Sequence, residues 1–367
     1  MKWSWFLVMV WVSLLTGCKN KTPVAPARLP QPPTVAARLA DAVLVWIRPE
    51  AGPEPGDSPE KGVWNDHLPA RTFWITPVGN TWTIVAVRPG LFVAAGTDLL
   101  EVEWSRFRYQ LKELPAQTEG ENAGLAHCRD VFDGWSEVDL NARGAGLVLR
   151  DPAAKTDIEV IQVPESIEAL DYNASTVRVA DVLGGLGNYM FVQVLGHEAS
   201  CGTGPDPIAE FHIVDLDARQ VVTQDFLEPT ENGPWVRYFD LPQRRQELAP
   251  SLKNQLKEHD SSLKYDPKDL AFFSMRPVFP AQLATVVFQV TYRYWAGCHA
   301  CPQLDGQALV ETLPPELAAY TDRHPALALV DGRLPEGWRI GGFSLLSAPP
   351  ARVVQLRGHF DATDDGK

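Results

Sequence analysis

Five cysteines are the residues of this sequence whose type and spacing could do chemistry. Two of them, Cys298 and Cys301, form a Cys-x-x-Cys motif that is followed by Pro302. A pair at this spacing can close a local disulfide, exchange disulfides through a thiolate of lowered pKa, or supply two ligands to zinc. Attachment of haem requires a histidine directly after the second cysteine, and Pro302 excludes it.

Thiol-disulfide exchange requires the first cysteine at the N-terminus of a helix, where the helix dipole stabilises the thiolate. Residues 303–306 are a poor first helical turn, and residues 307–310 are typical of the returning strand of a hairpin. We therefore predict that Cys298 and Cys301 form a structural disulfide at the hairpin tip, with redox activity and zinc binding as alternatives. The remaining pair, Cys128 and Cys201, would then form a second disulfide in an oxidising compartment.

A second motif, His-Glu-x-x-Cys, begins at His197 and ends at Cys201. The related zinc motif works because positions i and i+4 share one face of a helix. Gly196 and Gly202 bracket this segment and predict a loop, so we do not expect a metal site here. The sequence also lacks a phosphate-binding loop, a dinucleotide fingerprint and a Gly-x-Ser-x-Gly turn, and we assign no catalytic, cofactor-binding or metal-ligating residue.

The first residues indicate the compartment in which these cysteines reside. A basic Lys2 precedes an apolar run at residues 5–15, which is too short to span roughly 30 Å of hydrocarbon. The run ends in Leu-Thr-Gly-Cys at residues 15–18. This tetrapeptide resembles the lipobox of bacterial lipoproteins, which implies a signal peptide at residues 1–17 and an acylated Cys18 that anchors the chain in a bilayer.

Residues 18–39 predict a proline-rich tether between this anchor and a folded body. Lys19 stands where an aspartate would resemble an inner-membrane retention signal, which favours the outer membrane. The body that follows is typical of a globular protein, because the chain is 45% hydrophobic and 22% charged. The net charge of the whole chain, −13, argues against nucleic acid and against polybasic adhesion to anionic lipid.

Apolar residues recur with a period of two through most of the body, which predicts β-strands. The clearest hairpin joins residues 71–76 to a strand at residues 82–87 through a Gly79-Asn80 turn. In residues 100–111 the alternation changes phase at Ser105-Arg106, which predicts a β-bulge. Further strands are predicted at residues 146–150, 158–163, 189–195, 211–216, 285–295 and 352–360.

Two segments predict helices. Leu248, Leu252 and Leu256 recur every four residues and predict a helix near residues 250–259; a second, short helix is predicted at residues 316–323. The expected fold class is predominantly β, with antiparallel sheets in two packed units at residues 40–145 and 146–367. The second unit would be α+β, with the helix and the Cys-x-x-Cys hairpin.

The order of elements in residues 189–295 resembles the envelope domain attached to some anti-sigma factors and polysaccharide deacetylases. The parts are strand 189–195, a glycine-rich loop at 196–204, strand 211–216 with a turn at 217–219, the helix and strand 285–295. The loop departs from the Gly-Ala-His pattern of that domain. The resemblance implies a binding module and brings no catalytic motif.

The sequence therefore predicts a membrane-tethered bacterial envelope lipoprotein that acts as a non-catalytic binding or structural module, and an enzyme is the second class of function that it leaves open. Its expected partners are the lipid bilayer, through acylated Cys18, and an envelope protein or cell-wall glycan, bound through loops and exposed aromatic residues. Twelve tryptophans occur in the chain, and most of those beyond the leader are expected in the core. A thiol-disulfide redox protein that uses Cys298 and Cys301 is the alternative.

Overall fold

A computed structural model provides the three-dimensional structure of this chain. It describes residues 42–50, 70–78, 81–114, 123–132, 140–166, 175–199, 201, 206–227, 234–239, 242–259, 265–280, 286–295, 303–320, 325–348 and 350–361. The signal peptide, Cys18, the tether, the Gly79-Asn80 turn and the pair Cys298 and Cys301 lie outside the described residues. All described residues belong to one compact unit.

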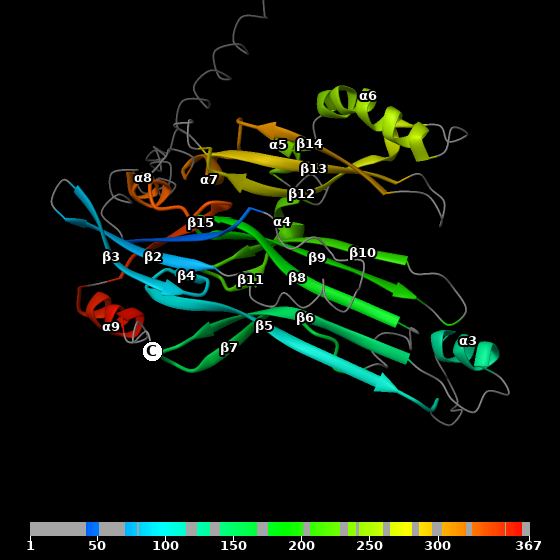
Figure 1. The fold of residues 1–367 in the computed structure, drawn as a ribbon, viewed down its shortest axis with the longest axis horizontal. Coiled ribbons are helices and arrows are strands. Elements are labelled where there is room, and N and C mark those ends of the chain that lie inside the picture. Colours follow the sequence, from blue (N-terminus) through cyan, green and yellow to red (C-terminus); the bar gives the residue numbers. More distant parts are fainter. Residues whose placement is uncertain are drawn as a thin grey trace, which may run out of the picture. The chain divides into compact units, whose positions relative to one another are not determined.

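A twelve-stranded sheet organises this unit (Figure 1). Its longest hydrogen-bonded path runs β11-β10-β9-β8-β15-β1-β2-β3, and β4, β5, β6 and β7 join it through the parallel pairing of β6 with β8. Most other neighbours are antiparallel. The strands are β1 (Ala42–Pro49), β2 (Arg71–Val78), β3 (Thr81–Pro89), β4 (Phe92–Ala95), β5 (Asp98–Leu111), β6 (Leu140–Asp151), β7 (Thr156–Ile161), β8 (Ser175–Leu186), β9 (Tyr189–Ala199), β10 (Asp206–Asp215), β11 (Gln220–Val221) and β15 (Trp338–Leu346).

A second, three-stranded antiparallel sheet has the order β12-β13-β14. It comprises β12 (Leu270–Val278), β13 (Val287–Trp295) and β14 (Gln303–Val310), and Pro267–Asp269 form a short 3-10 turn before it. Helices pack around both sheets. They are α3 (Ala123–Phe132), α4 (Thr223–Leu227), α5 (Val236–Phe239), α6 (Pro242–His259), α7 (Pro315–Ala318), α8 (Pro325–Asp331) and α9 (Pro350–Asp361). Helix α6 packs against the edge strand β14, and α8 and α9 pack against the edge strand β3.

Two large hydrophobic cores lie on opposite faces of the central strands. One packs the main sheet against the three-stranded sheet and contains Phe191 from β9 and Phe288 from β13, whose rings meet edge to face at 5.3 Å. The other lies where β5 and β6 fold back beneath β8 and β9, and it contains Leu149 and Val192. Figure 1 shows the resulting layers, with β12–β14 on one side of β8–β10 and β5–β7 on the other. The predominantly β fold class is confirmed.

Strand β5 contradicts the predicted bulge at Ser105-Arg106. Its register with β6 is continuous from Glu101, opposite Arg150, to Leu111, opposite Leu140. The change of phase has another cause: Val102 packs in the core beneath β8, whereas Phe107 packs in a separate small cluster. Because neighbouring side chains of a strand point to opposite faces, an odd spacing between them moves burial from one face of the sheet to the other without a bulge.

The predicted strand at residues 352–360 is wrong, because this segment forms helix α9. In a strand, Val354 and Leu356 would share a face, but Val354 is 72% exposed and Leu356 is 3% exposed. Leu356 and Phe360 are both buried, at the four-residue spacing of one helical face. The ring of Phe360 meets those of Trp74 and Phe92 edge to face, each at 5.5 Å. This packing selects the helix.

The predicted loop at residues 196–204 is also wrong in its first half, because β9 continues to Ala199 between β8 and β10. Gly196 is required here by close packing and not by a turn. A Cβ atom at this position would lie 1.7 Å from the carbonyl oxygen of Val177 on β8. The glycine that indicated a loop in the sequence therefore allows two strands to approach each other.

The helix predicted near residues 250–259 is confirmed, but α6 begins eight residues earlier and holds Pro250 in its interior. Its buried residues are Leu252 and Leu256. The second predicted helix ends sooner than expected, since α7 closes at Ala318. The boundary predicted at residues 145/146 lies within β6, and strands from both sides of it pair in one sheet. No helix in the described part of the chain is long and apolar enough to cross a membrane.

Candidate functional site

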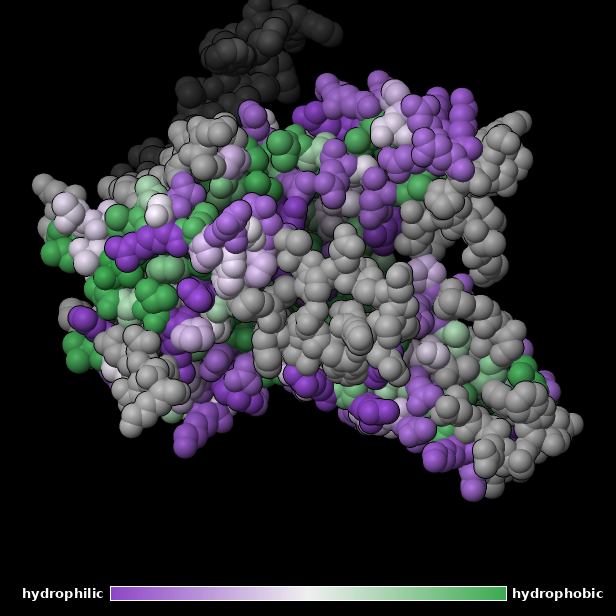
Figure 2. Space-filling model, in the orientation of Figure 1, coloured by the Kyte–Doolittle hydropathy of each residue, from purple (hydrophilic) through white to green (hydrophobic). Residues whose placement is uncertain are grey.

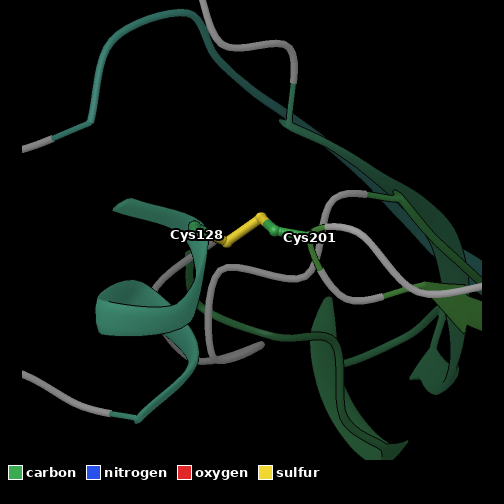
Figure 3. Close-up of a disulfide and its surroundings, with 2 residues drawn as sticks. All are labelled: Cys128 and Cys201. Atoms are coloured by element: carbon green, nitrogen blue, oxygen red, sulfur yellow. A yellow bond between two sulfur atoms is a disulfide. The ribbon is translucent and has the colours of Figure 1, made fainter. Parts of the chain in front are cut away.

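The disulfide between Cys128 and Cys201 is the chemical feature that the described cysteines form. Cys128 lies on α3 and Cys201 lies in the turn after β9, and their Cα atoms are 4.9 Å apart (Figure 3). Both residues are fully buried, at 1% and 0% exposure. This pairing is the one predicted by elimination from the sequence. The elimination assumed that Cys298 and Cys301 pair with each other. That second disulfide stays a prediction.

A small hydrophobic cluster explains why α3 docks at this end of the sheet. Leu125 and Cys128, one helical turn apart, face Phe107 of β5 and Leu140 of β6. Nearby, the hydroxyl of Tyr109 donates a hydrogen bond of 2.6 Å to the carbonyl oxygen of Pro164. The cluster is separate from the two large cores, so the disulfide ties a satellite of the fold to the central strands.

The ends of five strands meet beside this disulfide. Leu111 of β5 pairs with Leu140 of β6, and Asn141 of β6 pairs with Ser175 of β8. Ser175 pairs in turn with Ala199 of β9, next to the start of β10. The segments that connect these strands leave and re-enter the sheet at this end, which we call the disulfide-linked end. Connecting segments on a rigid sheet are a common location for binding residues.

An ion-pair network joins β8 to β10 across β9 near the same end. The Arg178 Nη2 atom lies 2.7 Å from both carboxylate oxygens of Glu210. The Nε2 atom of His212 lies 3.1 Å from Glu210 Oε2. The hydrogen bond from His212 and the charge of Arg178 hold the pKa of Glu210 below its usual value, although burial opposes the shift. A carboxylate satisfied in this way braces three strands and is a poor proton acceptor.

The His-Glu-x-x-Cys motif does not have the helical geometry of the related zinc motif. His197 and Glu198 lie within β9, so His197 and Cys201 do not share a helical face. No group of three or more histidine, cysteine, aspartate or glutamate residues in the described ranges could hold a metal ion. The Cys-x-x-Cys motif lies in the connection from β13 to β14, where Trp295 is opposite Gln303. The returning strand predicted at residues 307–310 is confirmed.

Three described tryptophan side chains lie in the interior, whereas Trp82, Trp104 and Trp338 are half-buried against the cores. Trp46, Trp74 and Trp235 are completely buried, and Trp104 donates its indole N–H to the carbonyl oxygen of Ala180 at 2.8 Å. The large apolar side chains that are exposed in the described ranges are all aliphatic: Val78, Val87, Leu195, Val221, Leu309 and Val354. Hydrophobic surface is visible over the β2 and β3 end of the sheet (Figure 2). The expected contacts through loops and exposed aromatic residues stay a prediction.

Comparison with known proteins gives little further information. No protein-family model matches the sequence, and no curated protein matches it significantly. Among solved structures, the chain is similar to the crystal structure of a DUF3298 family protein from Pseudomonas aeruginosa PAO1, with a TM-score of 0.29 and 12% identity over 62% of this chain and 97% of that chain. A similarity at this level defines neither a family nor a function. The resemblance to the anti-sigma and deacetylase envelope domain stays a prediction.

Proposed function

We propose that this protein is a lipid-anchored component of the bacterial envelope whose β-rich body is a non-catalytic binding or structural module. The disulfide between Cys128 and Cys201 carries this proposal. Such a buried cross-link persists in oxidising compartments and is rare in the cytosol, which agrees with export by the signal peptide. The disulfide-linked end of the sheet is the surface that we assign to an envelope protein or cell-wall glycan.

The anchor is tested by replacing Cys18 with serine. Several acyl chains bind a membrane far more firmly than one, because each buried CH₂ group contributes about 0.8 kcal/mol. We expect Cys18→Ser to abolish palmitate labelling and to move the protein from the membrane pellet to the soluble fraction. Cys128→Ser is the matched control and should keep the label. If the Cys18→Ser protein remains in the membrane pellet, the first residues act as an uncleaved anchor and the proposal is wrong.

The redox alternative is weakened by the elements that flank the Cys-x-x-Cys motif. Strand β14 begins at Gln303, two residues after Cys301, and pairs with β13 along its whole length. Thioredoxin-like sites place the first cysteine at the start of a helix, whereas here the residues from Gln303 onward belong to a strand.

Alkylation of the native protein tests this interpretation. We expect Cys298 and Cys301 to react with iodoacetamide only after reduction, because a closed hairpin disulfide offers no thiolate. Peptide mapping by mass spectrometry, with and without reductant, reads out both the modification and the pairing. Rapid labelling of Cys298 before reduction, with slow labelling of Cys301, would establish a reactive thiol and overturn the non-catalytic assignment.

A further inference from the structure

Three arginines from distant parts of the chain lie together at one place in the fold. Arg48 is at the end of β1, Arg339 is directly opposite it on β15, and Arg276 is on β12. The Arg48 Nη2 atom lies 3.5 Å from Asp181 Oδ2 on β8. We call Arg48, Arg276, Arg339 and Asp181 the arginine cluster. In the register of β1 with β15, two like charges face each other, which destabilises a sheet unless something compensates.

A local separation of strands creates the space for this cluster. Strands β8 and β15 pair only at Gly185 with Gly342 and at Leu186 with Phe343. Upstream of this pairing, the guanidinium of Arg48 donates a hydrogen bond to the carbonyl oxygen of Val182 on β8. Its side chain is 9% exposed. Arg48 therefore braces the gap between the strands and places a buried positive charge there.

Packing of the second sheet brings the third arginine to the cluster. Strand β12 packs against β8 and β15. Pro277 lies so close to Gly184 of β8 that a Cβ atom on this glycine would be 2.9 Å from the proline ring. The adjacent Arg276 donates through Nε to the side-chain oxygen of Gln289 at 2.6 Å. The cluster thus lies where two sheets meet, with Arg276 and Arg339 only half-buried and reachable from solvent.

The charges of the cluster do not balance. Burial, together with the charges of Arg48 and Arg276, lowers the pKa of Arg339 to about 10, although Asp181 and Glu50 oppose this shift. The pKa of Arg276 is lowered by burial and by Arg48. Asp181, within the cluster, and the exposed Glu50, two residues after Arg48 in the chain, are the two carboxylates whose charges act on Arg339, so three guanidinium groups face two carboxylates. One positive charge is in surplus.

Two arginine side chains of the cluster also have an unsatisfied hydrogen-bond donor. The Nε–H groups of Arg48 and Arg339 are buried and have no hydrogen-bond partner. Among the described residues, no hydrogen bond or ion pair satisfies the Arg339 side chain. A buried charged donor without a partner is unfavourable, and the forked guanidinium geometry matches the two oxygens of an oxyanion.

We propose that the arginine cluster is a binding site for an oxyanion and that its ligand is a carboxylate group. The single surplus charge matches a monoanion better than a dianionic phosphate. Arg339 and Arg276 would contact the carboxylate oxygens, while Arg48 supplies buried positive charge and holds the strands in place. The inference rests on the proposed binding role for its physiological meaning, since the partner would present the carboxylate.

The test uses the full-length lipidated protein in detergent and the small monocarboxylate propionate as the probe. We expect propionate to raise the thermal unfolding temperature above that in chloride of equal ionic strength. Arg339→Gln should weaken propionate binding roughly tenfold or more, because a hydrogen bond to a charged group is lost. Arg333→Gln, at an exposed position of the same segment, is the matched control and should bind propionate like the wild type.

The possible results distinguish a carboxylate site, a phosphate site and no anion site. Without a probe, Arg339→Gln should be at least as stable as the wild type, since it relieves repulsion from Arg48 and Arg276. Stabilisation by inorganic phosphate and not by propionate would overturn the carboxylate assignment. An equal response of Arg339→Gln and wild type, or no response to either anion, would overturn the site. None of these results depends on Cys18. The oxyanion site can therefore be refuted while the lipid anchor is confirmed, and the lipid anchor can be refuted while the oxyanion site is confirmed.

Discussion

Replacing Cys128 and Cys201 together by alanine is expected to lower the free energy of unfolding by about 4 kcal/mol. The disulfide links positions 73 residues apart, and a cross-link over a loop of this length removes much of the conformational entropy of the unfolded chain. Alanine is preferred to serine because both sites are fully buried, where an unpaired hydroxyl would add its own destabilisation. Denaturant unfolding of the double variant beside wild type measures the loss.

The matched control is the double variant Cys298→Ala with Cys301→Ala. A bridge between these residues would close a loop of only a few residues, so its removal should cost about 2 kcal/mol at most on the same entropic argument. Hydrogen exchange locates the effect: amides of α3 should lose protection in the Cys128 and Cys201 variant, because the helix rests on a small satellite cluster. A Cys128 and Cys201 variant as stable as the wild type would contradict this role of the disulfide.

Gly342→Ala is expected to destabilise the protein by about 3 kcal/mol or more through overpacking. The indole of Trp46, which is completely buried, is enclosed by Gly185, Gly341 and Gly342. A Cβ atom on Gly342 would lie 2.3 Å from Trp46 Cζ2 and 2.5 Å from the backbone nitrogen of Gly185. The second contact is with backbone, so a rotation of the indole alone cannot relieve it.

Gly358→Ala provides a control with the same chemical change. Gly358 lies on α9, and apart from the adjacent residues and the backbone of its own helix no atom lies within 4 Å of the Cβ position. Alanine is favoured over glycine in a helix by about 1 kcal/mol, so this variant should be slightly more stable than wild type. Near-ultraviolet circular dichroism reports the packing of the tryptophans in both variants. If Gly342→Ala unfolds at the wild-type denaturant concentration, the strands around Trp46 are less tightly packed than the structure indicates.

Local patterns in the sequence predict those helices and strands that bury the side chains of one face only. The hairpin of β2 and β3 pairs Val78 with Thr81, as the two-residue turn between them requires. The helix that carries Leu252 and Leu256 was predicted because both residues face one core. In β5 the same logic detected a change of phase but assigned it to a bulge. Only the positions of two separate clusters, one on each face of the sheet, explain it.

Residues that meet across long stretches of chain could not be predicted in this way. Segment 352–360 contains enough β-branched and aromatic residues to be typical of a strand, but contacts of Phe360 with Trp74 and Phe92 select a helix. Gly196 indicates a turn by its type, yet the close approach of β8 requires it within a strand. The arginine cluster has no signal in the sequence, because its residues share neither a motif nor a spacing.

The sequence by itself determined the predominantly β class, since apolar periodicity is a local property. The four cysteines after Cys18 predict disulfides but allow three pairings, and the structure decided that Cys128 pairs with Cys201. The sequence also predicts the acyl anchor at Cys18, which needs no fold to be recognised. The tertiary structure decided which face of each strand is buried, that residues 350–361 form a helix, and that Arg48, Arg276 and Arg339 come together. These features depend on register and on packing between sheets, which join residues hundreds of positions apart.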